Sequence, residues 1–233
     1  MTSVSRAQTS ADPAAPSARL GIDVVSDVVC PWCFIGKRRL EAAVEQAAQP
    51  VEIRWRPFQL DPTIPAIGLD RRSYLAKKFG SLEKVDTIHE RLIEAGKQVG
   101  IAFAFDRIER SPNTIDAHRL IRWSAAAGAQ GTVVEALFRT YFVEGRDIGD
   151  PKILVQLAGS CGMDGTLVHR LLASGSDTEA VREEIATAVR LGVSGVPFFI
   201  FAGKYAVPGA QSAEVLAAAI AKAHADEPTT AEA

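Results

Sequence analysis

The sequence predicts an α/β fold in which strands near both ends of the chain flank a long helical segment. Short apolar or alternating runs at residues 20–27, 51–60 and 197–207 are typical of strands. Between residues 66 and 176, apolar side chains instead recur every three or four positions, as on one face of a helix. The predicted order is therefore β-α-β, a long all-helical insertion between the second and third strands, and α-β-β-α.

The first unit has the pattern of a strand, a helix and a second strand. Residues 20–27 form a short apolar run, as in a buried strand. Residues 34–48 carry apolar side chains at helical spacing, and Pro50 ends that helix because proline has no N–H to donate. Residues 51–60 alternate between apolar and charged side chains, which predicts a strand with one exposed face.

The middle of the chain has the pattern of a series of helices. The segments expected to be helical are 74–80, 85–100, one opening at Ser111-Pro112, one through 134–142, and one starting at Asp150-Pro151. A proline in the first helical turn costs little, because the N–H that it lacks has no partner within the helix. Ser176 and Glu179 have the spacing of a capping box, which predicts a further helix that ends near Leu191.

The end of the chain returns to strands. Residues 197–201 are an apolar and aromatic run, and Ala202-Gly203 supplies a tight turn after it. Residues 204–207 are expected to pair back on this run as a hairpin. Residues 212–225 again have helical periodicity, so the chain is predicted to close on an amphipathic helix.

These patterns divide the chain into four regions. We expect residues 20–65 and 177–225 to form one domain, with residues 66–176 as a helical domain inserted into it. Residues 1–19 are rich in Ala, Ser, Thr and Pro, and residues 226–233 are polar. Both end regions therefore have the composition of disordered tails.

Composition narrows the class of protein. The chain has 233 residues, 47% of them hydrophobic and 23% charged, with a net charge of −2, so a basic nucleic-acid-binding surface is not expected. No apolar run approaches the roughly 20 residues of a membrane span. Residues 1–18 contain no apolar signal-peptide core, which predicts a cytoplasmic protein. Its three cysteines are too few for a disulfide scaffold and point to catalysis or metal binding.

The run Cys30-Pro31-Trp32-Cys33 carries the clearest chemical signal. It follows the first predicted strand and opens the first predicted helix. Unpaired N–H groups and the helix dipole at such an N-terminus favour an anion, so we expect Cys30 as the nucleophilic thiolate. Cys33, one turn further in, is then the resolving thiol. Pro31 suits the first helical position, and a partly exposed Trp32 offers a substrate an apolar contact.

A zinc site is the alternative interpretation of this cysteine pair. A structural zinc ion needs about four ligands, usually from two such pairs. The other candidate ligands are isolated on predicted helices: Cys161, His89, His118 and His169. We therefore expect no metal and a redox-active dithiol, while an inert cysteine pair stays open on the residues alone.

Five segments together resemble a known family. They are Ser26–Cys33, Ser111–Thr114, Ala117–Arg119, Gly195–Phe199 and Gly209–Gln211. The sequence resembles the DsbA-like thioredoxin-fold oxidoreductases, and more specifically their FrnE-like branch, from about residue 21 to residue 224. The same fold is similar to that of hydroxychromene-carboxylate isomerases and kappa-class glutathione transferases. The resemblance implies a thioredoxin-like domain interrupted by the helical insertion.

The resemblance also gives Val196 and Pro197 a role. On the residues alone, a trans proline opening a strand is the simpler interpretation. The family keeps a cis-proline loop that faces the cysteines, which implies a cis Val196-Pro197 bond here. It further implies that the backbone of Val196 pairs with an extended substrate segment and holds its sulfur near Cys30.

Four other residues have two open interpretations each. His118 is a candidate proton shuttle in the cleft between the two parts, or a structural histidine. Asn113 is a candidate lining residue of the same cleft, or simply a helix N-cap. Asp27 is a candidate acid–base partner of Cys33, or orders its loop. Cys161 is expected to be an inert buried thiol.

The predicted function is thiol–disulfide exchange through a mixed disulfide on Cys30. The substrate is a protein or small-molecule thiol or disulfide, the direction of exchange stays open, and the protein is a monomer or homodimer. No cofactor is expected to be bound, and glutathione or another thiol is the expected reductant. The alternative is a glutathione-dependent isomerase or transferase, although such relatives usually have serine at the position of Cys30. A chaperone whose helical insertion binds clients is a third possibility.

Overall fold

A computed structural model describes residues 19–226, so the predicted tails lie outside the described residues except for Arg19 and Asp226. Its main sheet has four strands in the order β2-β1-β5-β6. These strands are β1 (Leu20–Ser26), β2 (Val51–Pro57), β5 (Phe198–Phe201) and β6 (Tyr205–Pro208). β1 pairs in parallel with β2 and antiparallel with β5, and β5 pairs antiparallel with β6. The predicted α/β fold class is confirmed.

Helix α1 (Pro31–Glu45) connects β1 to β2, as the β-α-β pattern predicts. It packs against the last helix, α9 (Ala213–Ala225), and against helices of the insertion. The buried face of α1 includes Phe34, Ile35 and Leu40. Because the dithiol lies at the start of α1, this packing fixes the position of the cysteines.

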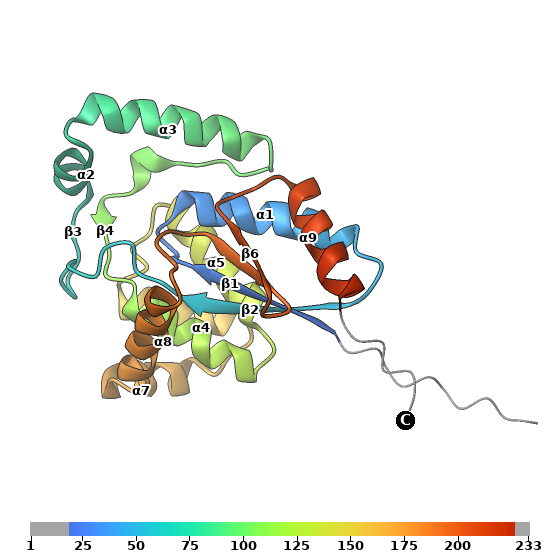
Figure 1. The fold of residues 1–233 in the computed structure, drawn as a ribbon. Coiled ribbons are helices and arrows are strands. Elements are labelled where there is room, and N and C mark those ends of the chain that lie inside the picture. The colour runs from blue at the N-terminus through green and yellow to red at the C-terminus, as the bar shows by residue number, and fades with distance from the viewer. Residues whose placement is uncertain (1–18, 227–233) are drawn as a thin grey trace, which may run out of the picture.

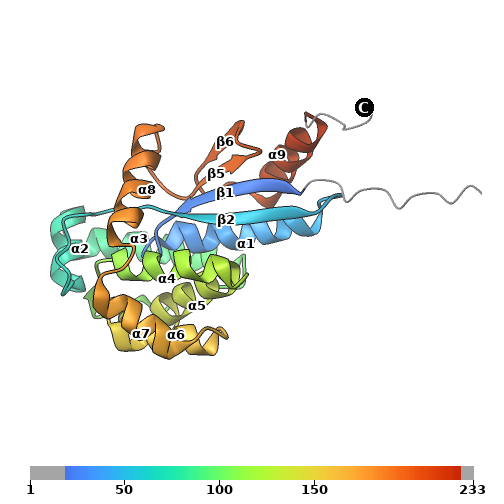
Figure 2. The same cartoon turned by 90° about the horizontal axis from the view of Figure 1, so that it is seen from below.

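The segment between β2 and β5 is mainly helical, with helices α2 to α8. They are α2 (Arg71–Phe79), α3 (Leu82–Lys97), α4 (Ile115–Ala126), α5 (Gln130–Phe142), α6 (Pro151–Ser160), α7 (Gly165–Ser174) and α8 (Thr178–Arg190). Figure 1 shows α2 at the end of the molecule where β1 ends and α1 begins. Figure 2 shows α6 and α7 as an outer layer beyond α4 and α5, on the side away from the sheet. No helix within residues 19–226 is long and apolar enough to cross a membrane.

The insertion also contains a short ribbon that the sequence does not predict. Strand β3 (Leu69–Asp70) pairs antiparallel with β4 (Arg110–Ser111), and one 3₁₀ turn lies at Phe105–Arg107. Because Ser111 pairs with Leu69, the next helix cannot begin at Ser111-Pro112 as predicted. It begins instead at Ile115, after the N-cap residue Thr114.

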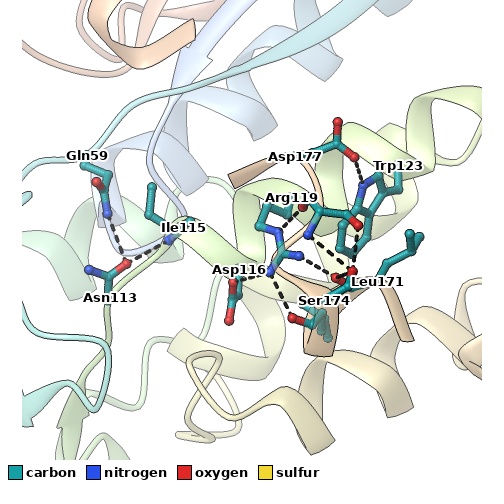
Figure 3. Close-up of polar contacts among 11 residues, drawn as sticks. Gln59, Asn113, Ile115, Asp116, Arg119, Trp123, Leu171, Ser174 and Asp177 are labelled. Carbon is teal, nitrogen blue, oxygen red and sulfur yellow. Dashed lines mark hydrogen bonds and ion pairs between the residues drawn. The ribbon is translucent and has the colours of Figure 1, made fainter. Parts of the chain in front are cut away.

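Two further predictions are wrong: the capping box of the helix that ends near Leu191, and the burial of Cys161. The N-cap of α8 is Asp177 rather than Ser176, with φ of 61° and no side-chain hydrogen bond to the helix, so the capping box does not form. The Asp177 carboxylate instead accepts a hydrogen bond from the indole of Trp123 at 2.8 Å (Figure 3). Cys161 is the C-cap of α6 and only half-buried, because the helix ends one residue before it.

An aromatic cluster joins α1 to the insertion. The Phe34 ring stacks on Phe138 of α5 with centroids 5.0 Å apart, and Phe142 and Phe103 surround it. Phe103 in turn stacks on Phe105 at 4.8 Å. Helix α1, which carries the dithiol, therefore packs in the same hydrophobic core as these phenylalanines of the inserted segment.

Candidate active site

The two cysteines lie where β1 turns into α1. Cys30 is the N-cap of α1 and Pro31 its first residue. The Cys30 N–H donates to the Asp27 carbonyl at 3.0 Å, and the Cys33 N–H donates to the Cys30 carbonyl at 3.0 Å. Both thiols are free and buried, with 4% of Cys30 and 1% of Cys33 exposed. Trp32, which lies between the two cysteines in the sequence, has 42% of its surface exposed.

The Val196-Pro197 loop lies against Cys30. The Val196-Pro197 peptide bond is cis, and the Cys30 thiol donates to the Val196 carbonyl oxygen with Sγ and O 3.6 Å apart. These two residues are 166 positions apart in the sequence. The structure thus brings together Cys30, Cys33, Pro31, Trp32, Val196 and Pro197, which the sequence named as site residues.

A glycine allows α1 to approach the proline loop this closely. A Cβ atom added to Gly36 would lie 2.9 Å from Cγ of Pro197 and 3.2 Å from Cζ of Phe199, and the first distance is shorter than real Cβ contacts. Both neighbours belong to the loop and strand that face the dithiol. Only a hydrogen at this position leaves α1 and the Val196-Pro197 loop at their observed separation.

We therefore expect Gly36→Ala to weaken the site. Alanine favours helix by about 1 kcal/mol over glycine, but crowding in a packed interior costs about 1–3 kcal/mol. The net change in the free energy of unfolding should be destabilising and accompanied by slower reaction of Cys30 with disulfides. Chemical denaturation and stopped-flow oxidation measure the two effects. Gly159→Ala, at a helical glycine whose added Cβ meets nothing within 4 Å, is the matched control. An equal gain in stability for both variants would contradict this packing argument.

Cys33 is held as a neutral thiol. Burial raises its pKa well above the ordinary value, and the hydrogen bond and charge of Cys30 raise it further. The nearby Ser26 hydroxyl and the Asp27 backbone act in the opposite direction but less strongly. Cys33 must therefore lose a proton before it attacks another sulfur, and that proton needs an acceptor.

A buried carboxylate lies in the loop before Cys30. Asp27 is buried, and its Oδ2 accepts the Leu60 N–H at 2.8 Å. Its Oδ1 lies 3.5 Å from Nε2 of His118 and has no hydrogen-bond partner among the described residues. Because Nε2 also lies 2.9 Å from the Phe58 carbonyl, which only accepts, Nε2 carries a proton and donates it there. His118 is thus buried beside Asp27, and it also lines a cavity between the end of β2 and helices α4 and α5.

Asn113 fixes the loop after β2. Its Oδ1 accepts from the Ile115 N–H at 3.1 Å and from Nε2 of Gln59 at 3.3 Å (Figure 3). Its Nδ2 donates to the Ile64 carbonyl at 2.6 Å. Asn113 therefore ties residues 59–64 to the start of α4. The alternative prediction of Asn113 as the N-cap is wrong, because the N-cap of α4 is Thr114. Gln59, its partner, carries no sequence signal.

A cavity of about 130 Å³ opens beside the dithiol, and the sequence does not predict it. Asp27, Val29 and Pro31 line it on one side, and residues of α2, α3 and the ribbon line the other. Its polar lining includes Arg71, Tyr74 and Tyr141. Within the part of the chain described, no three His, Cys, Asp or Glu side chains gather as metal ligands would.

Comparison with known proteins identifies the family. Residues 21–221 match the family model of the DSBA-like thioredoxin domain. The uncharacterized protein YwbO of Bacillus subtilis (strain 168) is 29% identical over 200 residues, which cover 85% of this chain and 94% of that protein. A probable DsbA oxidoreductase from Streptomyces coelicolor, SCO1869, has a structure similar to this one, with a TM-score of 0.84 and 30% identity over 92% of this chain and 94% of that chain. A 2-hydroxychromene-2-carboxylate isomerase shares the fold at 19% identity and a TM-score of 0.70, over 91% of this chain and 100% of that chain. The chain belongs to the DsbA-like thioredoxin family.

Proposed function

We propose that this protein exchanges thiols and disulfides through Cys30 and Cys33. The observation that carries the proposal is the placement of the Cys30 thiol. It lies at the N-terminus of α1 and faces the Val196 carbonyl of the loop before β5. Helix N–H groups there favour a thiolate, and the Val196 backbone is available to align a substrate strand. Membership of a redox-enzyme family supports the same chemistry.

The exchange proceeds in two steps. The Cys30 thiolate attacks one sulfur of a disulfide R–S–S–R′, so that a Cys30–S–S–R bond forms and R′S⁻ leaves with the electron pair. Cys33 then loses its proton and attacks the Cys30 sulfur, which releases RS⁻ and leaves a Cys30–Cys33 disulfide. The protein loses two electrons and the substrate gains them. The reverse sequence oxidises a pair of substrate thiols.

Asp27 is the proposed proton acceptor for Cys33. It is the buried carboxylate of the turn that carries the dithiol, and its Oδ1 has no hydrogen-bond partner among the residues described. His118 positions it, because the histidine is held by the Phe58 carbonyl and borders Oδ1 at 3.5 Å. Oδ1 therefore has room to accept a proton.

Glutathione or another cellular thiol is the proposed reductant. Two thiols are consumed each time the Cys30–Cys33 disulfide returns to the dithiol, so a plentiful thiol closes the cycle. The cytoplasmic location and the monomeric or dimeric state stay predictions of the sequence. A protein or a small disulfide is the proposed substrate.

The reduction potential of the pair is the first test. We expect a reversible two-electron transition in graded glutathione buffers, followed by fluorescence of the adjacent Trp32 and checked by counting free thiols. A midpoint near −270 mV would indicate a reductase, and one between about −120 and −180 mV an oxidase or isomerase. Trp32→Phe identifies the reporting tryptophan. Failure to form a reversible Cys30–Cys33 disulfide would overturn the proposal.

A glutathione-dependent isomerase is the second candidate. The likeness to a 2-hydroxychromene-2-carboxylate isomerase favours it at the level of the fold alone. Such a reaction would use the cavity beside Cys30 and need no second thiol. A Cys33→Ala variant that keeps full turnover with added glutathione would favour the isomerase, whereas loss of multiple turnover favours disulfide exchange.

A further inference from the structure

Arg71 is a buried cation in the cavity next to the turn that carries the dithiol. It is the first residue of α2, only 9% of its surface is exposed, and it lines the cavity that Asp27 and Pro31 border. The sequence analysis assigned it no role, and neither step of the proposed exchange uses it. A charged group in such a place requires an explanation, because burying an unpaired charge is unfavourable.

The hydrogen bond of Arg71 does not go to a carboxylate. Nη1 donates to the Tyr141 hydroxyl at 2.7 Å, and the guanidinium lies 5.6 Å from the centre of that ring. Nε is buried and has no hydrogen-bond partner among the described residues. None of the ion pairs among residues 19–226 includes Arg71. The Tyr141 hydroxyl in turn donates to the Arg110 carbonyl at 3.0 Å, so this tyrosine stays neutral.

A second buried arginine shows what full pairing looks like in this protein. Arg119 is 1% exposed, and its Nη1 donates to the Asp116 carboxylate at 2.7 Å (Figure 3). Its Nε and Nη2 donate to the carbonyls of Ser176 and Leu171 at 2.6 and 2.5 Å. Arg119 is therefore a structural ion pair with its donors used, whereas Arg71 keeps a buried donor unused and faces a cavity.

The other charged groups of the cavity also make hydrogen bonds, although Oδ1 of Asp27 makes none among the described residues. Asp61 accepts from the Tyr74 hydroxyl at 2.9 Å and from Thr63, and Lys78 donates to the same Tyr74 hydroxyl at 2.9 Å. Asp27 accepts from Leu60. Burial, and secondly the charge of Arg71, lower the pKa of His89, which leaves that histidine neutral. Two cations line this cavity: Lys78 is exposed at its rim, and Arg71 is the buried one with an unused donor.

We propose that Arg71 binds the carboxylate of a small acidic disulfide whose sulfur reacts at Cys30. This inference rests on the proposed disulfide exchange. A guanidinium pairs with a planar carboxylate through two parallel hydrogen bonds, and in a water-poor cavity such a pair is strong. The volume of about 130 Å³ and the apolar walls of Leu75, Ile88 and Leu92 suit a short aliphatic acid. Val29 and Pro31, the residues on either side of Cys30, line the same cavity, so the proposed complex has the carboxylate at Arg71 and the sulfur at the turn that carries Cys30.

The test compares three disulfides of nearly equal length and different charge. They are 3,3′-dithiodipropionate, which is anionic, bis(2-hydroxyethyl) disulfide, which is neutral, and cystamine, which is cationic. We measure the rate constant for oxidation of the reduced protein by each disulfide. Each value is divided by the rate constant for reaction of the same disulfide with a simple free thiol, which gives a normalised rate constant. We expect the normalised rate constant to be highest for the anionic disulfide, intermediate for the neutral one and lowest for the cationic one. In Arg71→Met the rate constant for the anionic disulfide should fall about 10- to 100-fold, as for removal of a hydrogen bond to a charged group. The rate constant for the neutral disulfide should change little.

The controls separate this inference from the proposed function. Arg72→Met removes an exposed neighbouring charge and should leave the order unchanged, and Arg71→Lys should restore part of the preference. In the unsubstituted protein, propionate should slow oxidation by the neutral disulfide and propionamide should not, which needs no variant. Equal normalised rates for all three disulfides, or an equal loss for all three in Arg71→Met, would overturn the carboxylate site alone. No oxidation by any disulfide would overturn the proposed function itself.

Discussion

Cys30→Ser should abolish disulfide exchange, and Cys33→Ser should stop it halfway. A serine hydroxyl at position 30 cannot form a disulfide, so no mixed disulfide and no Cys30–Cys33 bond can arise. We expect the rate of disulfide reduction to fall by at least about a thousandfold, as for loss of other catalytic nucleophiles. The measurement is turnover of a fluorescent disulfide with a thiol reductant.

Cys33→Ser should behave differently because it keeps the nucleophile. Cys30 still attacks, but nothing inside the protein displaces it from the substrate, so the mixed disulfide accumulates. Mass spectrometry should then show one substrate fragment on a peptide that contains Cys30. The half-buried Cys161 gives the matched control, since Cys161→Ser should change neither the rate nor the adduct. A mixed disulfide on Cys33 in the wild-type protein would contradict the assignment of roles.

Much of this site was predictable because its parts are local in the sequence. The strand, the Cys-Pro-Trp-Cys run and the following helix are consecutive, and hydrophobic periodicity reports such elements directly. The approach of Val196 to Cys30 is different, since these residues are 166 positions apart. Only the family resemblance indicated that contact, because no local pattern encodes a pairing across the whole insertion.

The residues that the sequence missed depend on tertiary contacts. Arg71 sits at the polar start of a helix, where an arginine is ordinarily exposed, and its burial follows from contact with Tyr141, 70 positions away. The sequence names His118 as a candidate but not its position beside Asp27, which depends on the Phe58 carbonyl. The two-residue strands β3 and β4 are too short to show any periodicity. The N-cap residue of helix α8, Asp177, has a positive φ, which local spacing does not reveal.

Asp27→Asn should slow the second half of the reaction without affecting the first. The amide occupies the space of the carboxylate and its oxygen can still accept the Leu60 N–H, but it cannot take a proton from Cys33. Attack by Cys30 on a disulfide needs no such transfer once Cys30 is a thiolate. We expect resolution of the mixed disulfide to slow by about 10²- to 10⁴-fold, the range for loss of a positioned general base. Rapid-quench alkylation separates the two steps.

The pH dependence of the resolution step distinguishes a proton acceptor from a merely structural carboxylate. Cys33 has a raised pKa, so in Asp27→Asn its thiolate forms only by loss of the proton to hydroxide. The rate of resolution should then rise about tenfold per pH unit from pH 6 to pH 9, since the thiolate fraction does so below the pKa. In the wild-type protein Asp27 takes the proton within the site, and the profile should be flatter. Asp61→Asn, at the other acidic residue of the cavity, should keep the wild-type profile. If Asp27→Asn slows both steps equally and leaves the pH profile unchanged, Asp27 only orders the loop before Cys30, and water or the leaving thiolate accepts the Cys33 proton.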